Sequence, residues 1–166
     1  ALDEALRLLS LGRDESRRLI GGLRPPVLDE LGIVAAIEYL VAEWRRPEGP
    51  EIELDHGVQF ERLAPPLETA AFRIVQESLN NVSRHAQAQM AWIFLDLTPP
   101  DSVTLSVRDD GTGFDPADSA RFEQRGHLGL KQMWERVERR NGTFEIHSQP
   151  GSGTEIRAAL PRGEMK

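Results

Sequence analysis

The sequence predicts an α+β fold of two layers, in which helices cover one face of a mixed, mostly antiparallel sheet, preceded by a protruding helix. Three observations predict it. Segments whose apolar residues recur at helical spacing are interspersed with short segments of alternating polarity. Two pairs of the short segments are separated by clusters of Pro or Gly, as hairpin strands are. A chain of 166 residues, 39% of them hydrophobic, also fits one ordinary domain with a modest appendage.

The first expected helix carries a seam from Leu2 to Leu23 with alternating spacings of four and three, the period of a helix in a bundle or coiled coil. Arg13 and Ser16 make two seam positions polar, so an ordinary amphipathic helix remains an alternative. The run Arg24-Pro25-Pro26 ends this helix, because proline has no N–H and biases its predecessor away from the α region.

A second helix is expected from Leu31 to Trp44, where apolar residues form a broad side. Prolines and a glycine end it, and the alternation from Glu51 to Val58 then predicts a half-exposed strand. We interpret His56 as one more side chain of that strand rather than a ligand or base. After Pro65-Pro66, a long helix is expected from Leu67 to His85.

The rest of the chain predicts two hairpins and one more helix. Their turns are Pro99-Pro100-Asp101 and the glycine-rich residues 149–153, and Asn141-Gly142 is typical of a left-handed helix cap. In chain order we expect strands Ala91 to Leu97 and Ser102 to Asp109, a glycine-bearing segment 110–129, a helix Leu130 to Arg140, and strands Thr143 to Ser148 and Thr154 to Leu160.

Composition excludes several classes of function. A formal net charge of -7 argues against a nucleic-acid partner, because such affinity rests on Lys and Arg neutralising phosphates. The absence of cysteine removes thiol nucleophiles and thiolate metal sites, and is compatible with a reducing cytosol. The chain shows no signal peptide or lipidation motif and opens in mid-helix without Met. We therefore expect a fragment, whose missing part could hold a membrane or sensory module.

Four polar residues of the 67–85 helix are candidates for a pocket wall. At about 100° per residue, Glu77, Asn81 and Arg84 share one stripe with His85 on its shoulder, at the border of the apolar face. A solvated helix edge is the alternative interpretation.

Three glycine clusters follow this helix. The strand that ends at Asp109 leads into Gly111 and Gly113, where paired glycines let a backbone approach a ligand and the carboxylate can accept from an amine. A simple turn is the alternative, and a calcium loop would need further acidic ligands. The second cluster, Gly126 to Leu130, precedes a helix, whose N-terminus favours phosphate. The third is Gly151-Ser152-Gly153-Thr154, and either of these two, taken alone, would be a cap or turn.

The order of these motifs resembles the four ATP-site boxes of the family shared by gyrase, the Hsp90 chaperone, histidine kinases and the mismatch-repair protein MutL. Residues 73–85 look like the first box of nitrate-sensor-like and thermosensor-like histidine kinases, and residues 23–32 are similar to the joint between their dimerisation helices and ATPase domain. The resemblance implies a Bergerat-type ATP-binding fold. It divides the chain into the C-terminal part of a dimerisation helix (1–24), a linker (25–32) and an ATP-binding catalytic domain (33–166).

The resemblance also implies roles for the polar helix residues. Asn81 would hold the Mg²⁺ that bridges the phosphates of ATP, and Arg84 and His85 would contact phosphate oxygens. Glu77 stands at the position of the family's acidic residue beside metal and water, so Glu77 and Asn81 are the implied catalytic residues.

For the nucleotide itself, Asp109 would accept a hydrogen bond from the adenine amine, and Thr154 would complete that contact through water. The implied glycine-box residues, which shape the pocket or let the backbone approach the triphosphate, are Gly111, Gly113, Gly126, Gly129 and Leu130. Residues 114–128 would form a mobile lid.

The implied reaction is transfer of the γ-phosphate of ATP to a histidine outside the fragment. None of the chain's four histidines lies in the family's acceptor pattern, so we expect ATP binding without autophosphorylation. Implied partners are the chain's own dimerisation and phosphoacceptor domain, a response regulator receiver domain and a second copy. The expected location is a cytoplasmic domain of a protein that could be membrane-anchored. Alternatives are an anti-sigma-type serine kinase or ATPase of the same superfamily, and a non-catalytic dimerisation module.

Overall fold

The computed structural model describes residues 25–45, 47, 49–57, 62–97, 99–118 and 128–163. The predicted helix before Pro25, Gly126 and most of the predicted lid lie outside these ranges. In chain order the elements are helix α2 (Pro26–Trp44), strand β1 (Glu51–His56), helix α3 (Pro65–Asn81), the π-helical turn η1 (Val82–Ala86), strands β2 (Met90–Asp96) and β3 (Ser102–Asp109), the 3₁₀ turn η2 (Pro116–Asp118), helix α5 (Leu128–Glu138), and strands β4 (Thr143–Ser148) and β5 (Thr154–Pro161).

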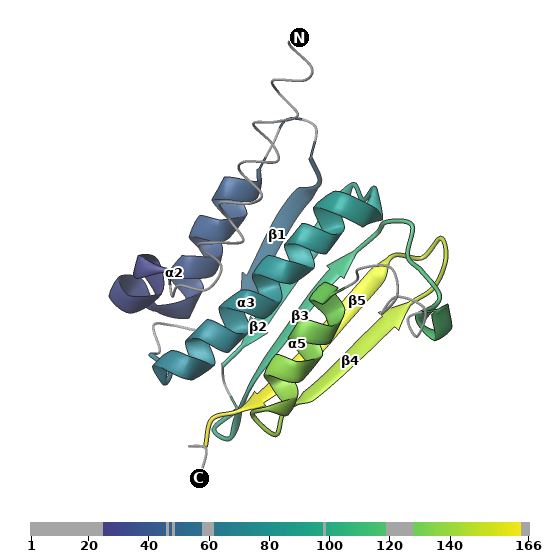
Figure 1. Cartoon of the computed structure of the whole chain (residues 1–166). Helices are drawn as coiled ribbons and strands as arrows, with labels where there is room; N and C mark the ends of the chain where they lie inside the picture. The colour runs from purple at the N-terminus through teal and green to yellow at the C-terminus, as the bar shows by residue number, and fades with distance from the viewer. Residues whose placement is uncertain are drawn as a thin grey trace.

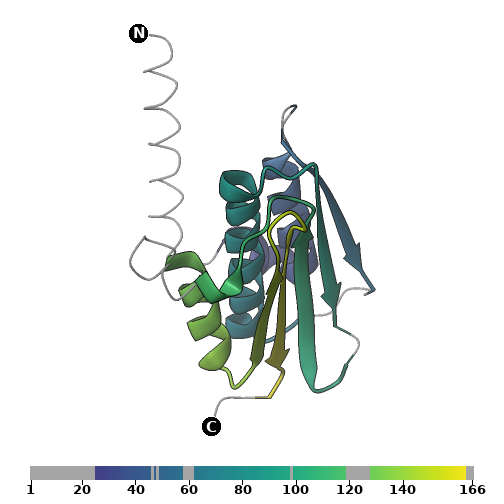
Figure 2. The ribbon, with the colours of Figure 1, turned by 90° about the vertical axis from the view of Figure 1, so that its right-hand side faces the viewer.

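The described strands form one sheet in the order β1-β2-β3-β5-β4. Strand β1 runs parallel to β2, while the other neighbouring pairs are antiparallel. Helices α2, α3 and α5 all lie on one face of this sheet (Figures 1 and 2). The prediction of a two-layer, mostly antiparallel α+β fold is therefore confirmed. None of the helices in the described ranges combines the length and apolarity that crossing a bilayer needs.

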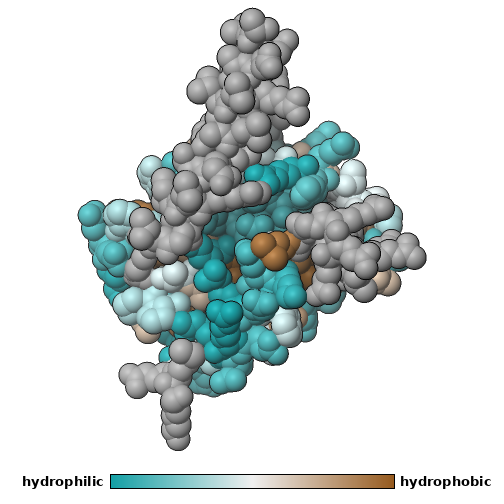
Figure 3. Space-filling view, in the orientation of Figure 1, coloured by the Kyte–Doolittle hydropathy of each residue, from teal (hydrophilic) through white to brown (hydrophobic). Residues whose placement is uncertain are grey.

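Alternation along β3 connects the core to the candidate site. Val103, Leu105 and Val107 face the helices and are buried, and Asp109 takes the next position of the same face. Helix α3 packs against these strands through buried apolar residues such as Ile74 and Leu79. Each such side chain contributes roughly 1.5–3 kcal/mol when it is fully removed from water. The outer side of the helical layer is mainly hydrophilic, as expected for helices whose apolar sides face a sheet (Figure 3).

The three described helices depart from the predicted boundaries, and α5, predicted from Leu130 to Arg140, spans Leu128–Glu138. The structure places the start of α2 at Pro26, but Gly32 has φ +82° and breaks the helix, so the regular part begins close to the predicted residue. Helix α3 ends at Asn81 and continues as the π turn η1, which closes with Gln87 in the left-handed region. The predicted left-handed cap after α5 is confirmed at Asn141, where φ is +53°.

Candidate functional site

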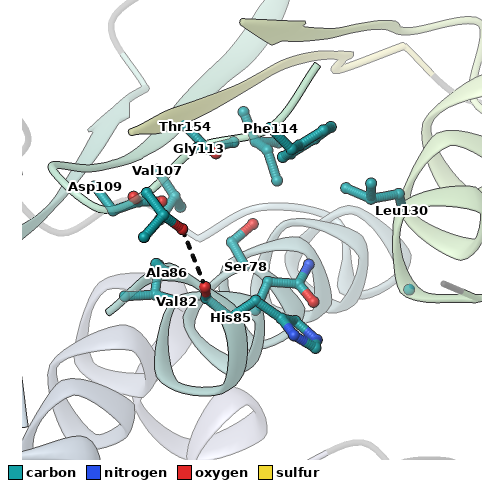
Figure 4. A pocket seen from close by; sticks show the side chains of 14 residues that line it. Ser78, Val82, His85, Ala86, Val107, Asp109, Gly113, Phe114, Leu130 and Thr154 are labelled. Atoms are coloured by element: carbon teal, nitrogen blue, oxygen red, sulfur yellow. Dashed lines mark hydrogen bonds between the residues drawn. The ribbon is translucent and has the colours of Figure 1, made fainter. Parts of the chain in front are cut away.

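A pocket of about 200 Å³ lies between the C-terminal end of α3 with η1, the end of β3, the start of β5 and the first turn of α5. Figure 4 shows Asp109, Gly113 and Thr154 along one side and Val82 and His85 along the other. The lining residues are Ser78, Asn81, Val82, His85, Ala86, Val107, Asp109, Thr112, Gly113, Phe114, Gly129, Leu130, Thr154 and Ile156.

The pocket brings together most of the residues that the sequence singled out. Those that line it are Asn81, His85, Asp109, Gly113, Gly129, Leu130 and Thr154. Glu77, Arg84 and Gly111 are not among the lining residues, and Gly126 lies outside the described ranges. A wider hollow of about 800 Å³ between α2 and strands β1 and β2 contains none of the predicted site residues.

Asp109 is a buried carboxyl group at one end of the pocket, 5% exposed. Its Oδ1 accepts a hydrogen bond from the N–H of Gly111 at 2.8 Å, and the backbone of Thr154 also donates to it. Burial raises the pKa of Asp109 above its usual value, and the hydrogen bonds from Gly111 and Thr154 oppose that rise. The pocket thus holds an acceptor that costs free energy when it is ionised without a ligand.

Asp110 has the opposite environment. Its Oδ1 accepts the N–H groups of Met90 and Gln89, each at 2.9 Å, on the surface. The bond from Met90 is the main reason why the pKa of Asp110 lies below its usual value. Of the two adjacent carboxyl groups, one therefore fastens β2 to the glycine turn and the other faces the pocket.

The turn after Asp109 requires glycine for steric reasons. A Cβ at Gly111 would lie 2.2 Å from the carbonyl oxygen of Ala86, and a Cβ at Gly113 would lie 2.0 Å from that of Gln149. Gly113 also has φ +59°, which L side chains rarely adopt. Between the two glycines, the N–H of Thr112 donates to Ala86 O at 2.7 Å, and its hydroxyl donates to His85 O (dashed in Figure 4). The turn is therefore pressed between η1 and the β4–β5 connection.

Ser148 is a site residue that the sequence analysis missed. Its hydroxyl group lies 2.9 Å from that of Thr154, donates to Gly153 O at 3.0 Å, and lies 2.9 Å from the N–H of Phe114, which donates to it. A serine at a strand end before a glycine-rich turn gave no signal of this role, because its three partners come from residues 5 to 34 positions away.

On the helical wall, Glu77 of the predicted stripe does not line the pocket, and the stripe reaches the pocket only at Asn81. Beyond it, the wider π turn presents Val82, His85 and Ala86 to the pocket, whereas Arg84 is exposed and outside the lining. Glu77 lies against the first turn of α5, since a Cβ at Gly129 would meet its Oε1 at 2.1 Å. Glycine at position 129 thus leaves the space that the Glu77 carboxyl group occupies.

These features define what the pocket can hold. Val107, Ile156 and Leu130 give it apolar walls, and Asp109 supplies an acceptor for an N–H group at one end. Its volume lies below the roughly 300 Å³ at which pockets for drug-sized ligands begin, so it can hold a small apolar group that carries an N–H donor. The N-terminus of α5 at Gly129 and Leu130, where backbone N–H groups have no intrahelical acceptor, favours a negatively charged substituent on that group.

Comparison with known proteins gives a consistent result. Residues 67–164 match the family model described as histidine kinase-, DNA gyrase B- and HSP90-like ATPase. An uncharacterized sensor-like histidine kinase of Chloroflexus aurantiacus is 32% identical over 163 residues, which are 96% of this chain and 27% of that protein. Sensor histidine kinase MctS of Rhizobium johnstonii is 34% identical over 161 residues, 97% of this chain and 34% of that protein.

A solved structure shares the fold. The histidine kinase domain of the Erythrobacter litoralis EL346 blue-light activated histidine kinase matches with a TM-score of 0.57 at 17% sequence identity, covering 77% of this chain and 57% of that one. At this identity the likeness concerns the arrangement of helices and strands. The family model adds the sequence likeness, and its matched range includes every predicted site residue from Glu77 to Thr154.

Proposed function

The chain belongs to the histidine kinase-, DNA gyrase B- and HSP90-like ATPase family, and on that premise we propose that its pocket binds Mg-ATP for phosphoryl transfer to a histidine. The observation that carries the proposal is the position of Asp109, a buried acceptor at the end of an apolar slot that also exposes Asn81 and the N-terminus of α5. The chain spans 27% and 34% of the length of the two relatives described above, so the activity of the whole protein is part of the proposal.

The buried carboxyl group of Asp109 and the apolar walls support the assignment of the adenine end of the site. Adenine is flat and carries an exocyclic amine, which matches apolar walls that converge on a carboxyl acceptor. The Oδ1 of Asp109 already accepts from Gly111, and the hydroxyl group of Thr154 is held by Ser148. These two contacts fix the acceptor and its polar neighbour before a ligand arrives, which lowers the cost of ordering them on binding.

The phosphate end rests on Asn81, His85 and the first turn of α5. When bound, Mg²⁺ neutralises charge on the transferring phosphoryl group, and it prefers oxygen ligands from few protein groups plus phosphates. The side-chain oxygen of Asn81 fits this requirement. Glu77, whose carboxyl group lies beside Gly129, would orient a water molecule next to the metal. His85 and the α5 N–H groups would bind the anionic tail. Arg84 is an exposed neighbour whose contact with phosphate would require its side chain to swing inward.

The partners follow from the proposed reaction. The acceptor histidine would lie on a dimerisation and phosphoacceptor domain of the same protein, and the phosphoryl group would pass on to the receiver domain of a response regulator. The two relatives described above are named a sensor-like histidine kinase and a sensor histidine kinase, which supports this assignment.

We predict that Asp109→Asn weakens Mg-ATP binding by about tenfold to hundredfold, since a hydrogen bond to a charged group is worth about 1.5–3 kcal/mol. Asparagine keeps one acceptor oxygen but turns an N–H group toward the position of the adenine amine. Isothermal titration calorimetry of both proteins with Mg-ATP measures the effect.

The thermal stability of the ligand-free Asp109→Asn variant supplies the control. Burial raises the pKa of Asp109 in the folded protein above its pKa in the unfolded chain. The free energy of unfolding therefore falls as the pH rises from the unfolded pKa through the folded pKa, and the ionised carboxylate remains destabilising at higher pH. Asparagine removes that cost and loses one backbone hydrogen bond, so the two effects oppose each other. Weak binding with an unchanged melting temperature supports the assignment, whereas unchanged binding contradicts it.

We also predict that this chain binds ATP without phosphorylating itself. His147 lies on an exposed position of β4 beside Glu145, and His56 lies beside Glu38 at 3.6 Å, both away from the pocket lining. With radiolabelled ATP, label should appear only when a separate protein that carries the phosphoacceptor helix is added. Label on this chain alone would overturn the prediction, and steady release of inorganic phosphate would favour an ATPase instead.

A further inference from the structure

We propose that Arg62 and Glu68 are positioning residues that fix the direction in which residues 25–31 leave the domain, and thereby where the phosphate-accepting helix stands relative to the pocket. The second half of this inference rests on the proposed function. Neither residue lines the pocket, so they act through residues 25–31, which connect the domain to the phosphate-accepting helix.

The contact consists of one guanidinium group with donors to two elements. Arg62 Nε donates to Glu68 Oε1 at 3.2 Å in the first turn of α3. Its Nη1 donates to Asp29 O at 3.1 Å and its Nη2 to Leu28 O at 3.2 Å. All three nitrogens of the guanidinium group are thus engaged, and they tie the first turn of α2 to the start of α3.

Burial distinguishes this ion pair from an ordinary surface one. The side chain of Glu68 is 0% exposed, whereas that of Arg62 is about half exposed, at 51%. Glu68 Oε1 also accepts the N–H of Leu63 at 3.3 Å. A carboxyl group at full burial is costly unless it is paired and hydrogen-bonded, and its partners hold it in one geometry. The buried carboxyl group of Glu68 therefore sets the orientation of the Arg62 side chain.

Gly32 makes the tied segment a separate unit. Its φ of +82° and ψ of -174° interrupt α2, so that residues 26–31 are not carried along as a rigid extension of the helix that follows. A Cβ at Gly32 would lie 3.1 Å from Cδ of Arg62 and 3.6 Å from Glu68 Oε1. The break at Gly32 thus lies beside the Arg62 side chain. Through its hydrogen bonds to Leu28 and Asp29, Arg62 holds the angle between residues 26–31 and the rest of α2.

The test compares Arg62→Ala and Glu68→Gln with the control Arg157→Ala. Arg157 is another half-exposed arginine that donates to a carboxylate, but its partner Glu155 lies on the same strand. In this chain, hydrogen exchange of amides 27–33 should quicken about tenfold or more in Arg62→Ala and less in Glu68→Gln, because glutamine can still accept from Arg62. Exchange in β3 and β5, and the affinity for Mg-ATP, should remain unchanged.

In the full-length protein, Arg62→Ala should lower the rate constant for phosphorylation of the acceptor histidine about tenfold, with the KM for ATP unchanged. Arg62→Lys, which keeps the charge but not the three-way geometry, should recover part of that rate. A wild-type rate in Arg62→Ala would overturn the inference, as would a parallel loss of ATP affinity and of protection throughout the sheet. Failure of the wild-type chain to bind Mg-ATP would instead overturn the proposed function.

Discussion

Alanine at position 113 is expected to lower the free energy of unfolding by about 3 kcal/mol or more and to abolish Mg-ATP binding at the proposed site. Two costs add. A left-handed backbone costs an L residue roughly 1–2 kcal/mol, and overpacking typically costs about 1–3 kcal/mol. Here the added Cβ would lie 2.0 Å from Gln149 O and 2.7 Å from Gly153 O, and backbone atoms cannot turn aside as side chains do. Urea denaturation of the ligand-free protein measures the loss.

Gly151→Ala is the matched control for this prediction. Gly151 has φ +82°, so alanine meets the same kind of backbone strain, but nothing lies within 4 Å of its Cβ position. We expect a loss of roughly 1–2 kcal/mol, the strain term alone. Equal losses in the two variants would show that the close approach at Gly113 does not matter.

The functional consequence follows from what the turn holds. The backbone at Gly113 lies next to Phe114, whose N–H donates to Ser148, and Ser148 in turn contacts Thr154. A displacement at position 113 therefore moves both the wall and the polar neighbour of Asp109. In the absence of denaturant, Gly113→Ala should therefore fail to bind Mg-ATP, even if the sheet remains folded.

The sequence predicted the layers and most strands because their signals are local. Alternation and the Pro-Pro-Asp turn predicted the strand Ser102 to Asp109 correctly, and Asn141-Gly142 predicted the left-handed residue that follows α5, although the helix itself ends at Glu138. The placement of Asp109 follows from the same alternation, since it continues the buried face of β3. In the sequence, however, Asp109 stands out because it ends a strand before a pair of glycines, and not because of the alternation.

Other features depend on contacts between distant residues and had no local signal. The stripe that placed Arg84 beside Asn81 assumed about 100° per residue, and the π turn at 82–86 changes that rotation. Ser148 and Arg62 have ordinary surroundings in the sequence, and their hydrogen bonds reach 34 positions along the chain. A glycine inside a helical segment is itself a signal for a break at position 32. The contact between this break and the side chain of Arg62 has no signal in the local sequence.

Asn81→Ala is expected to lower the rate of phosphoryl transfer to an added phosphoacceptor protein by about a hundredfold or more, because transfer depends almost entirely on positioning and on neutralising charge. Asn81 ends α3 at the pocket, and alanine offers no oxygen there for Mg²⁺. The variant should bind ATP equally with Mg²⁺ and with EDTA, whereas the wild type should bind more tightly with Mg²⁺. Titration under both conditions measures the metal contribution separately from the nucleotide contribution.

Asn80→Ala is the control, since Asn80 is adjacent on the same helix, has similar partial burial and does not line the pocket. Loss of a helical asparagine should change stability equally little in both variants, because alanine is the better helix former. A rate loss confined to Asn81→Ala, together with the loss of Mg²⁺ dependence, would place the metal at the junction of α3 and η1. Equal rates in the two variants would mean that the charge of the triphosphate is neutralised elsewhere, by His85 and the N-terminus of α5 alone.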